Sequence, residues 1–182
     1  MTYSISHLQQ FMSTARNLQV KTVTLYFEED YLYVLAYPHK EASLDNLDMT
    51  LGGKHFNWQI VYAAQVFYAF STVFSVVEDL TLTYRRQNMS SEWDNQADCI
   101  HWRKVLEPFV KVKNLSVDGG LVKQLSVALE PGEEESPMEL LPELQELSYS
   151  ASGDSRKDSR NAFTQFADTH QKASRPVTVV QF

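Results

Sequence analysis

The chain has 182 residues, of which 43% are hydrophobic and 21% are charged, and its formal net charge at pH 7 is -7. This length and composition predict one globular domain over 1–182, with an irregular N-terminal part (1–57) and more regular repeats (58–182). The negative charge argues against nucleic-acid binding, because contacts to phosphates need a basic face.

The first third of the chain contains two predicted strands. Val20–Phe27 and Tyr31–Tyr37 are rich in β-branched and aromatic residues, and the acidic turn Glu28–Asp30 joins them. Before them, Met1–Gln19 has no basic segment followed by an apolar core, so no signal peptide is predicted. Together with a single cysteine, Cys99, this indicates a cytoplasmic or nuclear protein without an internal disulfide or a Cys-based zinc site.

An uncharged run from Trp58 to Val77 has about the length of a membrane span. Gln59, Gln65 and three hydroxyl side chains lower its hydropathy, and after it the chain alternates like a strand as far as Tyr84. A buried helix over Trp58–Phe74, followed by a strand, is therefore predicted instead of membrane insertion. The apolar residues at helical spacing are Ile60, Ala63, Ala64, Phe67, Phe70, Phe74 and Val77.

Polar loops and helical patterns alternate through the rest of the chain. Further helices are predicted at Trp102–Phe109, Leu121–Leu129 and Asn161–Ala173. The predicted loops are polar, Pro/Gly-rich or serine-rich, and they are Gln87–Asp98, Glu130–Pro137 and Ser148–Arg160.

A short phrase with apolar residues at positions i, i+3 and i+5 recurs five times. Its last two apolar residues alternate like a strand with one buried face, and its first closes the turn before that strand. The central residues Val23, Leu47, Leu80, Leu115 and Leu147 are 24, 33, 35 and 32 residues apart, wider and less even than in regular leucine-rich repeats. With helices between the later copies, this predicts an α/β fold, a divergent leucine-rich-repeat-like solenoid of strand–helix units with a mainly parallel sheet. The copies are Val20–Leu25, Leu44–Met49, Val77–Leu82, Val112–Val117 and Leu144–Tyr149, with a weaker sixth at Pro176–Val180.

The strands of such a solenoid present one face to the core and the other to a partner. The expected inward residues are Leu80, Leu82, Leu115, Val117, Leu147 and Tyr149. The opposite, concave face is small and polar, with negative character from Asp48, Asp79 and Asp118, and its large side chains are Tyr26 and Tyr84. This face either binds a partner or is simply solvated, and the sequence favours neither interpretation over the other. The candidate partner-binding residues are Tyr26, Asp48, Thr81, Thr83, Ser116, Asp118, Ser148 and Ser150.

The sequence lacks the common motifs of catalytic and metal-binding sites. It has no His-Glu-x-x-His, no phosphate-binding glycine loop and no nucleophile elbow, and its five histidines lack ligand spacing, so each is interpreted as a surface or cap residue. Neighbouring carboxylates such as Glu78 and Asp79 are expected to point to opposite faces. An anion could dock at Asp118-Gly119-Gly120, before a helix, but a tight turn with a positive φ is the simpler interpretation. No catalytic, metal-binding or cofactor-binding residue is predicted.

Two segments of the C-terminal half carry a family resemblance. Leu140–Tyr149 (LLPELQELSY), which follows Val112–Val122 (VKNLSVDGGLV), resembles the repeat region of fungal F-box/leucine-rich-repeat-like proteins. The resemblance implies that the repeats recruit a substrate to a ubiquitin ligase, to which an N-terminal F-box attaches through Skp1. Met1–Gln19 is too short for a three-helix F-box, so Skp1 binding is not carried over to this chain. Further similar segments are Ala64–Phe67, Ser90–Trp93, Ala162–Phe166 and Arg175–Val179.

These observations together predict a non-catalytic protein–protein interaction module without a cofactor, whose protein partner is not identified. One alternative is a truncated structural remnant without a specific partner, with a poorly capped N-terminal edge. The other is a small-anion-binding protein or enzyme built around the Asp118-Gly119-Gly120 turn. Neither nucleic acid nor a membrane is expected as a partner.

Overall fold

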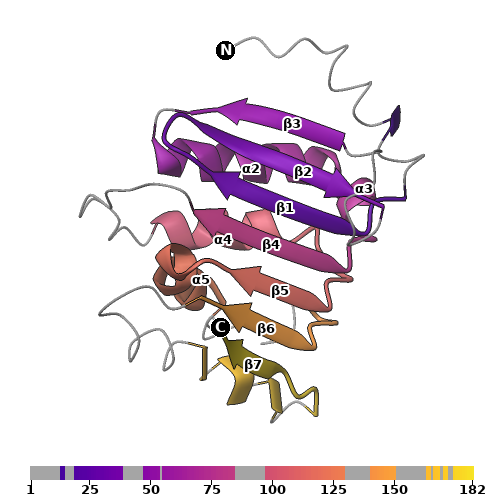
Figure 1. Ribbon diagram of the computed structural model, residues 1–182, viewed down its shortest axis with the longest axis vertical. Helices are drawn as coiled ribbons and strands as arrows, with labels where there is room; N and C mark the ends of the chain where they lie inside the picture. Colours follow the sequence, from indigo (N-terminus) through magenta and orange to yellow (C-terminus); the bar gives the residue numbers. More distant parts are fainter. Residues whose placement is uncertain are drawn as a thin grey trace.

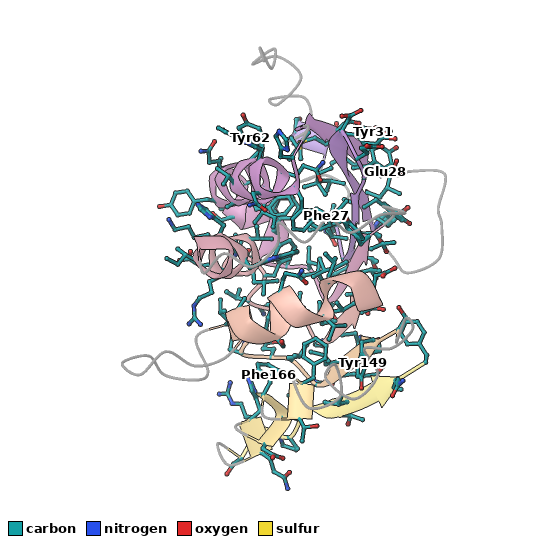
Figure 2. The ribbon with its side chains drawn as sticks, turned by 90° about the vertical axis from the view of Figure 1, so that its left-hand side faces the viewer. Phe27, Glu28, Tyr31, Tyr62, Tyr149 and Phe166 are labelled. Carbon is teal, nitrogen blue, oxygen red and sulfur yellow. The ribbon has the colours of Figure 1, made fainter. Side chains whose placement is uncertain are left out.

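A computed structural model describes residues 13–14, 19–38, 47–53, 55–84, 97–129, 140–150, 163–164, 166–168, 170–171 and 174–182. These residues form an α/β structure in which helices cover one face of a seven-stranded sheet (Figure 1, Figure 2). The strands are β1 (Thr22–Phe27), β2 (Tyr31–Tyr37), β3 (Leu47–Gly52), β4 (Asp79–Tyr84), β5 (Asn114–Val117), β6 (Glu146–Tyr149) and β7 (Thr178–Gln181). The helices are α2 (Phe56–Ala69), α3 (Ser71–Phe74), α4 (Ala97–Leu106) and α5 (Val122–Leu129), with a 3-10 turn η1 (Gly119–Leu121) before α5.

The sheet is open and mainly parallel, which confirms the predicted α/β class and strand direction. Its order is β3-β2-β1-β4-β5-β6-β7, and β1, β4, β5, β6 and β7 are parallel to one another. The phrase Leu44–Met49 departs from this pattern, because β3 lies at the edge and pairs antiparallel with β2, which itself pairs antiparallel with β1. The short connections explain this, since a parallel crossover needs a dozen or more residues and only 28–30 and 38–46 join these strands.

The inward residues predicted from the repeated phrase are buried. Leu80, Leu82, Leu115, Val117, Leu147 and Tyr149 are each at most 1% exposed. The phrase's first residue is buried as well, at Val20, Val77, Val112 and Leu144. Because side chains alternate across a strand, this places the intervening polar residues on the face opposite the helices.

The uncharged run folds as two helices followed by β4. All seven apolar positions predicted to face the core are buried, from Ile60 to Val77. The single helix expected over Trp58–Phe74 is wrong in one respect, because Phe70 has non-helical dihedrals (φ -107°, ψ 21°) and separates α2 from α3. Beyond this break Phe74 packs against Phe67, with ring centroids 4.7 Å apart. In the described part of the chain, no helix has the length and hydropathy needed to cross a bilayer.

The remaining helices lie beside α2 on the same face of the sheet, where α2 packs against α4 and α4 against α5 (Figure 2). Helix α4 overlaps the predicted Trp102–Phe109 but begins earlier, at Ala97, and ends earlier, at Leu106. It ends there because Pro108 cannot continue a helix. Trp102 is fully buried beside Phe27, which points from β1 toward the helices, with ring centroids 5.5 Å apart. Helix α5 agrees with the predicted Leu121–Leu129, and the described residues within Asn161–Ala173 are helical.

Candidate functional site: a polar hollow on the open sheet face

The sheet face opposite the helices, here called the open face, carries rows of polar side chains across the strands. The register pairs Thr24 with Thr81, Thr81 with Ser116, and Ser116 with Ser148. Two residues earlier on each strand, a second row runs through Thr22, Asp79, Asn114 and Glu146. Because neighbouring strands lie about 4.8 Å apart, side chains within a row are in contact range of one another.

These two rows line a hollow with a volume of about 410 Å³. Small threonine and serine residues of β1, β4, β5 and β6 make up half of the lining residues, and larger residues lie beside them. Its volume falls in the range of pockets that hold small ligands or single side chains of a partner. The residues that line it are Thr22, Thr24, Tyr37, Asp79, Leu80, Thr81, Asn114, Ser116, Glu146 and Ser148.

The charged groups of the hollow are two carboxylates. The side-chain amide of Asn114 donates a hydrogen bond to Oδ1 of Asp79 over 2.7 Å, which orients that carboxylate. Glu146 is exposed to solvent at the beginning of β6. No lysine, arginine or histidine is among the described residues that line it, so the formal charge of these residues is negative.

Tyrosines of β1 and β2 continue the open face beyond the hollow. Tyr26 faces Tyr33 in the register, and their ring centroids are 6.4 Å apart. The hydroxyl of Tyr33 donates to Oδ2 of Asp48 over 2.8 Å, and this hydrogen bond raises the pKa of Tyr33, so the phenol keeps its proton at neutral pH. Burial also raises the pKa of Tyr37. These rings supply the large, rigid contact area that is common where proteins bind one another.

The candidate residues predicted from sequence divide into three groups. Thr81, Ser116 and Ser148 line the hollow, and the register gives the alignment expected for them. Tyr26 and Thr83 are paired in the next row, and Asp48 bonds to Tyr33 on the same face. Asp118 and Ser150 directly follow the ends of β5 and β6, outside the hollow.

One predicted large side chain of the open face was wrong, and the tyrosines of β2 were missed. Tyr84 is buried on the helix side and packs edge-on against Phe56, with ring centroids 5.8 Å apart, because it shares the parity of Leu82 in β4. Tyr33 and Tyr37 were missed, although the alternation in Tyr31–Tyr37 places both opposite the buried Val34 and Ala36. Tyr37 lines the hollow, and the further lining residues that were missed are Thr22, Thr24, Asn114 and Glu146, which the same two-residue period would have found.

In the turn Asp118-Gly119-Gly120, a side chain of the turn already binds a backbone N–H group that an anion would otherwise use. Oδ1 of Asp118 accepts a hydrogen bond from the backbone N–H of Gly120 over 3.0 Å. A carboxylate in this position repels an anion. The predicted positive φ is wrong for Gly120, where a Cβ would instead lie 3.1 Å from Cδ1 of the Tyr84 ring, so close packing accounts for the glycine.

A chain of ion pairs lies where the parallel strands begin. Glu78, immediately before β4, binds Nζ of Lys21 at 2.6 Å and Nζ of Lys113 at 2.8 Å. The hydrogen bond from Lys113, followed by that from Lys21, lowers the pKa of Glu78 to about 2. Its neighbour Asp79 lines the hollow on the open face, so the two adjacent carboxylates diverge as predicted.

The predicted surface or cap position of the histidines is wrong for His170. This side chain is 1% exposed and packs against the ring of Phe166, and its burial lowers the pKa of the imidazole. His55 is the exposed N-cap residue of α2, whereas His7 and His39 lie outside the described residues. Over the ranges that the structure describes, no cluster of three or more His, Cys, Asp or Glu side chains is placed to hold a metal ion.

Comparisons of the chain with protein-family models, with curated proteins and with solved structures found no match. The interpretation of the open face therefore depends on its geometry and chemistry.

Proposed function

We propose that this chain is a non-catalytic protein–protein interaction module and that a partner protein binds to its open face. The observation that carries the proposal is the hollow of about 410 Å³, lined by side chains of five neighbouring strands on the face opposite the helices. Tyrosines beside the hollow add the kind of side chain that concentrates binding energy at protein interfaces.

The proposal includes a leucine-rich-repeat-like solenoid, similar to the substrate-recognition repeats of fungal F-box proteins. Two features support it. From β1 onward each strand lies next to the following parallel strand of the chain, and the helices between them are all on one face (Figure 1). Repeat proteins of this kind use the exposed strand face for binding. A cytoplasmic or nuclear location and a role in substrate recruitment for a ubiquitin ligase belong to the same proposal.

Affinity capture of the tagged chain from its native cells, with mass spectrometry of the bound proteins, tests this function. Thr81→Arg combined with Ser116→Arg places two long cations in the hollow, and we expect the specific partner to be lost. Gln65→Arg combined with Thr72→Arg is the matched control, because it adds the same charges at exposed positions of α2 and α3. Thermal unfolding of both variants checks that they remain folded.

Each result of the capture has a distinct meaning. A partner retained by the control and lost by the double variant supports binding at the open face. A partner retained by both places the interface elsewhere. Recovery of chaperones alone, equally for all three proteins, favours the structural remnant, and recovery of Skp1 requires a docking mode without an F-box.

A further inference from the structure

The charged residues that line the hollow are acidic. Asp79 and Glu146 are the charged residues among the ten that line it. The nearest basic residues in sequence, Lys21 and Lys113, both bind Glu78 and are not among the lining residues. Within the described ranges, the exposed carboxylate of Glu146 has no ion pair. A cationic group that enters the hollow would therefore meet two carboxylates, and none of the described residues that line it is basic.

Acceptor groups line the same space. Thr22 lines the hollow, its side chain is 7% exposed, and its Oγ1 has no hydrogen-bond partner among the described residues. An unsatisfied buried hydroxyl is costly, and it gains from a donor seated against it. Ammonium and guanidinium groups are donors only, with three and five N–H bonds, so they suit a site made of hydroxyls and carboxylates.

The hollow is long across the strands. Its lining extends from Tyr37 on β2 to Glu146 and Ser148 on β6, which is four strand spacings in the sheet order, or about 19 Å. An extended peptide of about six residues has this length. The small side chains of the row Thr24, Thr81, Ser116 and Ser148 leave room for its backbone to approach the sheet.

We propose that the hollow binds an extended, basic segment of the partner and that a lysine or arginine of this segment lies between Asp79 and Glu146. The proposal rests on the protein-binding function proposed above and names the chemistry of the partner. The two carboxylates bind the cation and the threonine and serine hydroxyls accept its remaining N–H groups. The ring of Tyr37 closes the β2 end of the hollow, where a second cation of the segment stacks on its face.

The test is an array of nonapeptides that are randomised except at the central position, which is fixed in turn as each amino acid and probed with the full chain. We expect selection for Arg or Lys at that position and against Asp or Glu. Asp79→Asn combined with Glu146→Gln removes both charges but keeps an acceptor beside Asn114. Titration with the selected peptides should show affinity lower by about tenfold or more for this variant.

Glu107→Gln combined with Glu143→Gln is the control, because it changes the net charge equally at exposed residues outside the hollow. Its affinity for the selected peptides should equal that of the unaltered chain. No selection for a basic residue, or selection of equal strength in Asp79→Asn/Glu146→Gln, overturns the proposal.

The captured partner separates this inference from the proposed function. If the partner is lost with Thr81→Arg/Ser116→Arg but kept with Asp79→Asn/Glu146→Gln, it binds at the open face, but not through a basic segment in the hollow. A partner kept with both variants, in the absence of peptide selection, removes both proposals.

Discussion

The side chain of Glu78 connects the beginnings of three strands. It joins the residues that precede β1, β4 and β5 through its pairs with Lys21 and Lys113. The backbone repeats this connection, since the N–H of Glu78 donates to the carbonyl of Lys21 and the N–H of Lys113 to that of Glu78. The carboxylate thus holds the strand ends that border the hollow in register.

Replacement of Glu78 by Gln should make the stability of the protein less sensitive to acid. The folded-state pKa of Glu78 is about 2 and its ordinary value is 4.5, so the carboxylate stabilises the fold fully above pH 4.5 and loses this effect as the pH falls toward 2. Urea midpoints measured at pH 7, 5, 4 and 3 should fall more steeply for the unaltered chain than for Glu78→Gln. Both lysines and the carboxylate are partly exposed, so the effect should shrink in high salt.

Glu107→Gln is the reference for this measurement, because it removes an exposed carboxyl that forms no ion pair within the described residues. Its urea midpoints should follow those of the unaltered chain at every pH. Parallel curves for Glu78→Gln and the unaltered chain would show that the ion pairs do not stabilise the fold.

At the residue scale, the two-residue period predicted burial better than it predicted the site. Leu80, Leu115 and Leu147 were placed correctly because an apolar residue flanked by polar ones in a strand has one favourable orientation. Tyr33 and Tyr37 were not assigned to the open face, although the alternation that buries Val34 and Ala36 places them there. The ion pairs of Glu78 join residues 57 and 35 positions apart, and no local pattern indicates such a contact.

At the scale of elements, Gln59 fixes α2 to the hairpin of β1 and β2. Its side chain is fully buried, and its Nε2 donates to the carbonyls of Glu28 and Gly53, each over 2.8 Å. Glu28 follows β1 and Gly53 follows β3, so one amide of the helix joins the ends of two strands. This buried amide explains a polar residue in an otherwise apolar helical stripe.

Gln59→Leu, which keeps the side-chain volume, should lower the free energy of unfolding by about 1–3 kcal/mol, because two carbonyls lose a donor. Urea denaturation at pH 7 measures this change. Gln65→Leu, at an exposed position of the same helix, is the control and should change stability little. A cost for Gln59→Leu no larger than that for Gln65→Leu would contradict the proposed connection.

The sequence predicted the existence of the elements more accurately than their ends and partners. Periodicity located Tyr31–Tyr37 as β2 and Leu121–Leu129 as η1 and α5. It did not indicate the break at Phe70 or the antiparallel edge strand β3, whose phrase at Leu47 looks like the parallel ones. Short connections decide the direction of β3, so loop length carried information that the apolar pattern did not.

At the scale of the whole molecule, the order of contacts follows the order of the chain from β4 onward. Each of these strands pairs with its successor, β4 itself pairs with β1, and α2, α4 and α5 touch in sequence. In repeat proteins, where each unit contacts its neighbours alone, stability is a sum of local terms and loss of one interface remains partly local. The open sheet of this chain permits the same behaviour, which distinguishes a solenoid from one cooperative core.

Leu147→Ala tests this distinction at β6. Leu147 is fully buried, so the substitution should cost about 2–5 kcal/mol at that site. Hydrogen exchange of the intact protein, read by mass spectrometry, should show faster exchange in β5, β6 and β7, while β1 and β2 keep their protection. Val23→Ala, at a buried position of β1, should have the reverse distribution. Equal acceleration in all strands for both variants would mean that the sheet unfolds as one unit, and the solenoid proposal would then fail even if the open face binds its partner.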